Sequence, residues 1–391
     1  MKHISSNIKP KAQISLENQK DNFFPAKQVL TLASAHGAHD FYTGFLAPLL
    51  PILIDKLSLL KVQGGLLSSF LLWPSALQPI IGRVADRKNL KKYIFLAPAI
   101  SGIFMSLLGV APNYTILAII LLIAGINSAG FHAITPAIAG RISGNNIGKG
   151  MSYWIVGGQL AWMIGPIVIT SVVSLFSVRA TPWLMIGGIG ASFILFFLLK
   201  NVDVQALPNN NEIPLASSIK TIAPIFLPMI GVITGRSLIS SATSSFLPLY
   251  LTDQGASLLL AGTMQTVNIG SGILGTLIGG NLRDKIGGKP IIIISILGSL
   301  LFMILFLNVG GLYQIVTLIL LGIFSAMLLP VNLAMVQEYS PENRFLANGL
   351  YLAIQFFIRA LAGIIIGFLY DQFGGQQAFL YGAIFSIIAM P

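Results

Sequence analysis

The chain contains no cysteine, and only 9% of its 391 residues are charged. The absence of cysteine excludes disulfide bonds, thiol catalysis and thiolate metal sites. The shortage of charge excludes an ordinary soluble domain, in which about a quarter of the residues are charged. Acidic residues are especially few, with 12 Asp and Glu against 23 Lys and Arg.

Hydrophobic residues make up 55% of the chain and gather in long runs. Apolar runs of about 20 residues are typical of transmembrane helices. We predict twelve spans, at residues 29–54, 62–84, 93–111, 114–140, 150–176, 181–200, 221–251, 258–281, 290–308, 312–337, 346–369 and 376–391. The last span is short, so we expect the sequence to stop inside its twelfth helix. The sequence therefore predicts an all-α integral membrane protein.

The basic residues are distributed unevenly between the segments that join the spans. With a cytoplasmic N-terminus, 18 Lys and Arg lie on the inner side and three (Lys56, Lys61 and Arg179) on the outer side. This bias predicts a protein of the inner or plasma membrane with both termini in the cytoplasm. Since the basic excess sets the orientation, we expect the lipid bilayer as its surroundings and no nucleic acid as a partner.

Two segments half a chain apart resemble each other. "GRVADRKNLKK" (82–92) follows the second span and "GNLRDKIGGKP" (280–290) follows the eighth, and each places Asp-Arg or Asp-Lys four residues after a glycine. The segment 201–220 between the halves is polar, as a linker would be. We predict a cytoplasmic tail (1–28), a six-helix bundle (29–200), a cytoplasmic linker (201–220) and a second six-helix bundle (221–391). Repeated halves with a binding site at their interface are typical of secondary transporters.

The duplicated Gly-x-x-x-Asp-(Arg/Lys) loops resemble the signature of the major facilitator superfamily. The stretches "SAHGAHDF", "SALQPIIGRVADR", "GFHAITPAIA" and "GTLIGGNLRDKIGGK" further resemble the fosmidomycin resistance protein group of drug exporters. The sequence departs from these patterns at Asn89, where the loop normally has glycine, and at Ala133, where the group tends to have proline. The resemblance covers nearly the whole chain. It implies two pseudo-symmetric bundles, alternating access, and a cavity lined by spans one, four, seven and ten.

The loops predict a gate on the cytoplasmic side. An acid at a helix end can bond a helix N-terminus or an arginine in one conformation and release it in the other. The alternative is a solvated basic loop that only sets topology. The candidate gating residues are Gly82, Asp86, Arg87, Gly280, Asp284 and Lys285.

The first span carries an unusual polar stripe. His36, His39, Asp40 and Thr43 are spaced i, i+3, i+4 and i+7, so they share one helix face. A charged Asp at the bilayer centre costs about 2.5–3.5 kcal/mol, so such a residue is expected to be functional. We predict that Asp40, His36, His39 and His132 of span four carry protons, since histidine titrates near neutral pH. The alternatives are a fixed structural pair for Asp40 and a packing role for His132.

Two arginines and several amides lie within the predicted spans. Arg236 and Arg359 are either counter-ions for Asp40 or handles for an anionic substrate. The amides either bind substrate or hold helices together. The candidate substrate-binding residues are Arg236, Asn127, Asn332, Gln159, Gln355 and Arg359.

In span five, Gly165 and Pro166 resemble a degenerate form of the antiporter motif of exporters, with ordinary glycine packing as the alternative.

These features predict a proton-coupled antiporter that exports a small, anionic or zwitterionic molecule or drug. No phosphate-binding loop or hydrolase motif occurs, so we predict no enzyme activity, no cofactor and no resident metal ion. One bundle pair suffices for transport, which predicts a monomer. An alternative is a divalent metal exporter that uses His36, His39 and Asp40, with His132 as a fourth ligand.

Overall fold

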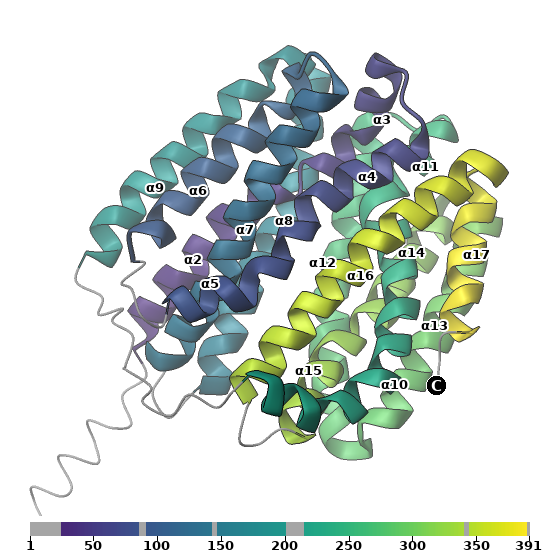
Figure 1. The fold of residues 1–391 in the computed structure, drawn as a ribbon. Coiled ribbons are helices and arrows are strands. Elements are labelled where there is room, and N and C mark those ends of the chain that lie inside the picture. Colours follow the sequence, from purple (N-terminus) through teal and green to yellow (C-terminus); the bar gives the residue numbers. More distant parts are fainter. Residues whose placement is uncertain (1–24, 86–90, 143–146, 201–214, 340–343, 389–391) are drawn as a thin grey trace, which may run out of the picture.

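The structure, a computed structural model, describes residues 25–85, 91–142, 147–200, 215–339 and 344–388. Within these ranges every regular element is a helix, which confirms the predicted all-α class. Figure 1 shows two helical bundles side by side, the first formed by α2 to α9 and the second by α10 to α17.

The first bundle begins after Pro25. Its helices are α2 (Ala26–Thr43), α3 (Leu46–Leu57), α4 (Lys61–Leu72), η1 (Trp73–Leu77), α5 (Gln78–Ala85), α6 (Lys91–Ser106), η2 (Leu108–Val110), α7 (Tyr114–Ile142), α8 (Ile147–Leu175), η3 (Val178–Leu184) and α9 (Met185–Leu199).

The second bundle follows the same plan. Its helices are α10 (Leu215–Ser241), η4 (Ala242–Phe246), α11 (Leu247–Asp253), α12 (Leu258–Ile286), α13 (Gly288–Asn308), α14 (Gly311–Ala326), α15 (Leu328–Tyr339), α16 (Arg344–Phe373) and α17 (Gly375–Ile388).

Eight helical stretches of the described chain are long and apolar enough to cross a membrane, and they match the predicted spans two to six and nine to eleven. They are Lys61–Ile81, Lys92–Val110, Tyr114–Pro136, Tyr153–Leu175, Val178–Leu199, Gly288–Asn308, Gly311–Asn332 and Leu350–Phe373. The first, seventh and eighth predicted spans are also helical but carry polar stripes, and the described part of the twelfth is short. The total of twelve therefore stays a prediction.

The seventh predicted span contains a π-helical turn, η4, between α10 and α11. Pro248 lies just beyond this turn, and a proline ring displaces the carbonyl group four residues earlier. That carbonyl belongs to Ser244, and it accepts a hydrogen bond of 2.8 Å from Nε2 of Gln265 on α12. The sequence "SSFLP" thus exposes a backbone acceptor in the middle of a span, as π-turns at functional sites commonly do.

The second predicted gating loop proved to be helical. Gly280, Asp284 and Lys285 lie in the last turns of α12, which ends at Ile286. The first residue to break the helix is Gly287, whose φ of +85° suits glycine. In the other copy, Gly82 lies within α5, whereas Asp86 and Arg87 lie outside the described residues. Asp284 therefore lies at a helix end, as the sequence predicted, within the last turn and not in a loop, and the gating role stays a prediction.

The last residues of the predicted linker 201–220 are helical. Helix α10 begins at Leu215, because residues 215–220 contain neither glycine nor proline to stop it. Residues 201–214, like most of the tail 1–28, lie outside the described residues.

The two bundles meet along three helix pairs, namely α4 with α16, α8 with α12, and α3 with α11. Glycines allow this approach: a Cβ at Gly65 would collide with the backbone oxygen of Gly363. At one end, Asp371 of α16 accepts hydrogen bonds of 2.7 Å from the N–H groups of both Lys61 and Val62. These are orphan donors in the first turn of α4, so a carboxylate of one bundle caps a helix of the other. We call this end of the molecule the α3–α11 end.

Replacing Asp371 by alanine is expected to loosen the α3–α11 end, which the charge distribution predicts to be the outer side. Each hydrogen bond to a charged acceptor contributes about 1.5–3 kcal/mol, and about 1.4 kcal/mol shifts a conformational equilibrium tenfold. Because the chain has no cysteine, Ser68→Cys supplies a single thiol, buried on α4 beside Gly363. We expect a membrane-impermeant maleimide added outside the cell to label this thiol several-fold faster when Asp371 is alanine.

Asp55→Ala is the matched control, because Asp55 is an exposed carboxylate on neighbouring α3. It should leave the labelling rate unchanged. Equal rates for Asp371→Ala and Asp55→Ala would show that the cap does not hold this end closed.

Candidate functional site

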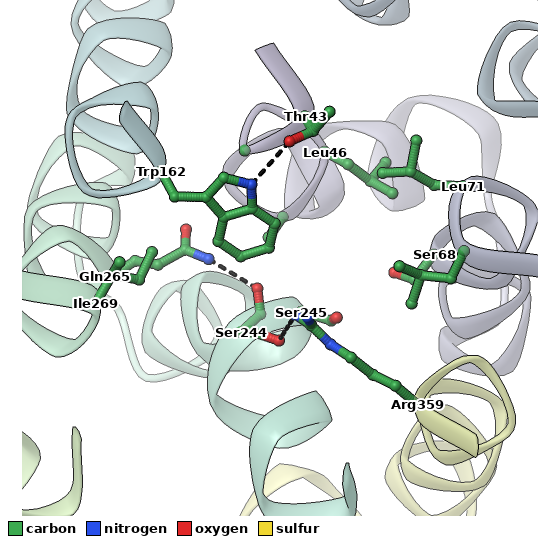
Figure 2. A pocket seen from close by; sticks show the side chains of 13 residues that line it. Thr43, Leu46, Ser68, Leu71, Trp162, Ser244, Ser245, Gln265, Ile269 and Arg359 are labelled. Carbon is green, nitrogen blue, oxygen red and sulfur yellow. Dashed lines mark hydrogen bonds between the residues drawn. The ribbon is translucent and has the colours of Figure 1, made fainter. Parts of the chain in front are cut away.

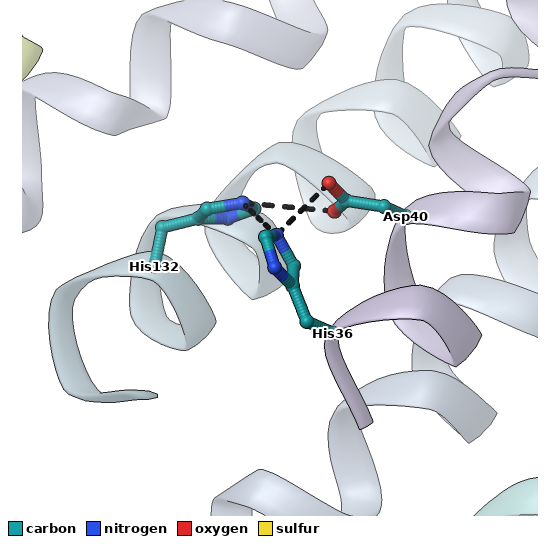
Figure 3. Close-up of side chains that lie close together, drawn as sticks. All are labelled: His36, Asp40 and His132. Atoms are coloured by element: carbon teal, nitrogen blue, oxygen red, sulfur yellow. Dashed lines mark hydrogen bonds and ion pairs between the residues drawn. The ribbon is translucent and has the colours of Figure 1, made fainter. Parts of the chain in front are cut away.

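Helix α2 presents its polar stripe to the interior of the first bundle. His36, His39 and Asp40 are all buried, with exposed fractions of 5%, 0% and 9%. His132 of α7 joins them from another helix, and Figure 3 shows His36, Asp40 and His132 converging. The structure therefore brings together all four residues that were predicted to carry protons.

The cluster is centred on the Asp40 carboxylate. His36 Nε2 lies 3.1 Å from Asp40 Oδ2, and His132 Nε2 lies 3.6 Å from Asp40 Oδ1. The two imidazole nitrogens are themselves 3.2 Å apart. His39 Nε2 lies 3.8 Å from Asp40 Oδ1. In the part of the chain that the structure describes, neither arginine of the spans forms an ion pair with this carboxylate; histidines surround it instead.

Backbone carbonyl groups fix which ring nitrogen of His36 and His132 carries hydrogen. His36 Nδ1 lies 2.7 Å from the Trp154 carbonyl oxygen, and His132 Nδ1 lies 3.0 Å from that of Ser128. A carbonyl oxygen only accepts, so Nδ1 is the donor in both rings. In the neutral tautomers both Nε2 atoms then present lone pairs. Three acceptor groups thus face one another, and hydrogen bonds between them require at least one added proton.

His39 is held by a different chain of hydrogen bonds. The Tyr93 hydroxyl donates to Asn127 Oδ1 (2.9 Å), and Asn127 Nδ2 donates to Ser101 Oγ (2.8 Å). Ser101 Oγ lies 2.8 Å from His39 Nδ1, so its free hydrogen points to that ring. The chain leaves the hydrogen on His39 Nε2, which lies 3.8 Å from Asp40 Oδ1 and has no hydrogen-bond partner among the described residues. Asn127 also donates to the Ala97 carbonyl (2.9 Å), so its amide orients His39 and does not face the pocket described below.

Close packing holds the imidazole rings in place. His36 stacks on the Trp154 ring at 3.8 Å between centroids, and His39 stacks on Phe131 at 4.6 Å. A Cβ at Gly158 of α8 would collide with the His36 ring. His132 also contacts the ring of Phe356 on α16, at 6.4 Å between centroids. The cluster therefore belongs to the first bundle but contacts the second.

A pocket lies between the bundles one helix turn beyond the cluster (Figure 2). Thr43, which completes the stripe of α2, lines this pocket and accepts a hydrogen bond of 2.7 Å from Trp162 Nε1. Thr43 in turn donates to the Asp40 carbonyl (2.9 Å). The remaining lining residues are Gly44, Leu46, Ala47, Ser68, Leu71, Leu72, Ser244, Ser245, Gln265, Ile269 and Arg359.

The predicted substrate-binding residues are distributed over several places. Of these six, Arg359 alone lines the pocket. Gln159 Nε2 lies 3.5 Å from Thr276 Oγ1 across the bundle interface, a contact of the kind that holds helices together.

Arg236, Asn332 and Gln355 lie in the second bundle, each with a buried polar atom that has no hydrogen-bond partner among the described residues.

Gly165 and Pro166 lie where α8 crosses its neighbours. A Cβ at Gly165 would lie 2.6 Å from the Phe41 carbonyl oxygen of α2, and one at Gly262 of α12 would lie 3.1 Å from the Pro166 carbonyl oxygen. The glycine thus permits close helix packing, and a specific role in antiport stays a prediction.

Sequence reasoning missed Trp162, Ser244, Ser245 and Gln265 in the pocket. The signal for the serines was the run "SSATSSFLP" in the seventh predicted span, where small polar residues precede a proline. Gln265 and Trp162 carry no comparable local signal, because the pocket assembles from α2, α3, α4, α8, η4, α12 and α16.

A bundle pair of apolar helices with a buried acid and a pocket between its halves has the architecture of a membrane transporter. The chain belongs to the Major Facilitator Superfamily, whose family model matches residues 32–312 and 229–391. This confirms the family resemblance noted in the sequence and shows a multi-pass transporter of small molecules in place of an enzyme.

Among curated proteins, the chain is 22% identical over 367 residues to the fosmidomycin resistance protein of Escherichia coli, covering 92% of this chain and 90% of that protein. It is 23% identical over 361 residues to the multi-drug resistance efflux pump PmrA of Streptococcus pneumoniae, covering 87% and 89% of the two chains. These relatives support an efflux type of transporter and give no support to the metal-exporter alternative.

Among solved structures, a point mutant of the nucleoside transporter NupG matches with a TM-score of 0.76 at 18% identity, covering 93% of this chain and 98% of that one. A bacterial homologue of the human lysosomal transporter Spinster, inward-facing and unoccupied, matches with a TM-score of 0.77 at 15% identity, covering 94% and 96%. At these identities the likeness shows the shared fold alone.

Gly158→Ala is expected to destabilise the protein by about 1–3 kcal/mol, because the new methyl group displaces the His36 ring from its place between Trp154 and Asp40. The measurement is the thermal unfolding midpoint of the purified protein in detergent. Gly190→Ala is the matched control, since a Cβ there meets nothing within 4 Å. A midpoint as high for Gly158→Ala as for Gly190→Ala would contradict the close packing of His36.

Proposed function

We propose that the protein is a proton-coupled antiporter that exports a small organic molecule by alternating access. The observation that carries this proposal is the convergence of Asp40, His36 and His132 as three acceptors that need a shared proton. A site that holds a proton between several acceptors within the membrane is suited to load and release protons.

The proton cluster and the pocket are adjacent but separate. Asp40 and Thr43 lie one turn apart on α2, and Thr43 bonds both to the Asp40 backbone and to Trp162 of the pocket. A change in protonation that moves α2 therefore moves a pocket wall. In the proposal, α2 couples proton binding to cargo binding. The protein changes conformation in one direction when it carries the proton and in the other direction when it carries the cargo.

Alternating access needs interfaces that form in one state and part in the other. The contacts of α3 with α11 and of α4 with α16, together with the Asp371 cap, close one end of the bundle pair. We propose that this end is the outer one and that the structure is an inward-facing state with both termini in the cytoplasm.

Export is favoured over import by the functions for which two relatives are named. A resistance protein and a multi-drug efflux pump both resemble this chain over most of its length. We therefore propose drug or metabolite efflux across the inner or plasma membrane, carried out by a monomer.

Asp40→Asn is expected to abolish uphill efflux, because the amide keeps the shape of the side chain but cannot exchange a proton at working pH. Cells that lack other exporters should become tolerant to at least one compound of a drug panel that includes fosmidomycin when they express the native protein. The Asn variant should give at least about tenfold less protection, the magnitude common for loss of one functional group.

A protonophore should remove the protection given by the native protein. Asp55→Asn, the same change at an exposed site, is the control and should protect as well as the native protein. Equal protection by Asp40→Asn would refute proton coupling through this residue.

A further inference from the structure

The second bundle contains two arginines without acidic partners. Within the described part of the chain, neither Arg236 of α10 nor Arg359 of α16 forms an ion pair. The Nε atoms of both side chains are buried and have no hydrogen-bond acceptor there. A guanidinium group keeps its charge at working pH, so each is an uncompensated cation within the membrane protein.

Arg359 points into the pocket between the bundles (Figure 2). Its Nη2 donates to Ser244 Oγ at 2.8 Å, and its guanidinium carbon lies 5.4 Å from the centre of the Trp162 ring. Serine and tryptophan orient the fork without neutralising it. The remaining donors of Arg359 are therefore free for a ligand.

Arg236 adds a second positive charge near the first, and the two cations repel each other. Its neighbour Tyr351 is fully buried, and Asn332 lies beside that tyrosine. Tyr351 OH and Asn332 Nδ2 are also without hydrogen-bond partners among the described residues. None of these three residues lines the pocket, so Arg236 adds positive charge to it without contacting a ligand there.

The other lining residues indicate the chemistry of the rest of the ligand. Trp162 offers an aromatic face, and Leu46, Leu71 and Ile269 offer apolar surface. We propose that this pocket binds the anionic group of the cargo, a carboxylate or a phosphonate carried on an aromatic or apolar body, with Arg359 as its direct ligand and Arg236 as the supporting charge. The inference rests on the proposed export function and names the class of molecule exported.

The two arginines and Asp40 lie in different bundles, so in this proposal the cargo and the proton bind at separate sites. Arg359 and Arg236 belong to the second bundle, and Asp40 belongs to the first. Because Trp162 of α8 and Arg359 of α16 face each other across the interface, an anion bound between them contacts both bundles. Cargo binding therefore acts on the same interface that must part during transport.

The test measures binding to the purified full-length protein in lipid nanodiscs. Benzoate and phenylphosphonate are the anionic probes, and benzyl alcohol and benzylamine carry the same ring with no charge or with positive charge. We expect the anions alone to raise the unfolding midpoint at concentrations up to about 10 mM, a range suited to weak fragments. The better of the two anions identifies the planar or the tetrahedral group.

Arg359→Gln should weaken binding of the better anion about tenfold or more, which is the effect of losing one charged hydrogen-bond partner. It should also leave the midpoint without ligand equal or higher, because an unpaired buried charge is removed. Arg359→Lys keeps the charge without the fork and should bind with intermediate affinity. Arg179→Gln, the same change at an exposed arginine, should bind as the native protein does.

Equal stabilisation by benzyl alcohol or benzylamine, native affinity in Arg359→Gln, or no effect of either anion on the native protein would each overturn the inference. The two assays separate this inference from the proposed function, because anion binding is measured without a proton gradient and without transport. A failure of proton coupling in cells leaves the anion site standing, and a failure of anion binding leaves proton coupling standing.

Discussion

The Asp40 carboxylate is the constraint on which the first bundle depends, because an acid inside the membrane is tolerated only when its surroundings satisfy it. Three imidazoles supply those surroundings. The Trp154 and Ser128 carbonyls and the Ser101 hydroxyl each orient one ring. Gly157 and Gly158 let α8 approach α2 closely enough to deliver the Trp154 contact. The helix packing and the chemistry of the site are thus one arrangement, since a shift of α8 would leave the acid without its partners.

The two bundles share a fold, but the charged groups buried within them have opposite signs. The first places an acid among imidazoles, and the second places guanidinium groups among amide and hydroxyl groups. These charges do not neutralise each other, because Asp40 pairs within its own bundle and neither arginine forms an ion pair among the described residues. A transporter that kept them paired would have no vacancy for a proton or an anion. The proposed proton site and the proposed anion site both depend on this separation.

The polar stripe of α2 was predictable, because its four residues follow helical spacing in an otherwise apolar span. The helical class followed from the long apolar runs, and the family from the duplicated Gly-x-x-x-Asp-(Arg/Lys) segments. The inward orientation of the stripe followed from the cost of placing an acid among lipids. The role of Asn127 was not predictable, since its partner Ser101 lies on a different span and no spacing rule relates them. The pocket was missed for a similar reason: Ser244 offers its carbonyl in the π-helical turn before Pro248, and Trp162 lines the pocket from the other bundle. The second gating segment, "GNLRDKI", extends the helix further than its glycine and charges suggest, because the first residue to end α12 is Gly287.

The two helices that form the cap on α4 differ in how well they tolerate mutation, because one contributes a side chain and the other contributes backbone groups. Asp371 bonds to peptide groups, which almost every amino acid carries, so replacements at positions 61 and 62 leave the donors in place. Proline is the exception, because it lacks the N–H group. On the opposite side the contact depends on the single carboxylate. Most substitutions of Asp371 on α16 therefore remove the cap, whereas at positions 61 and 62 on α4 only proline does.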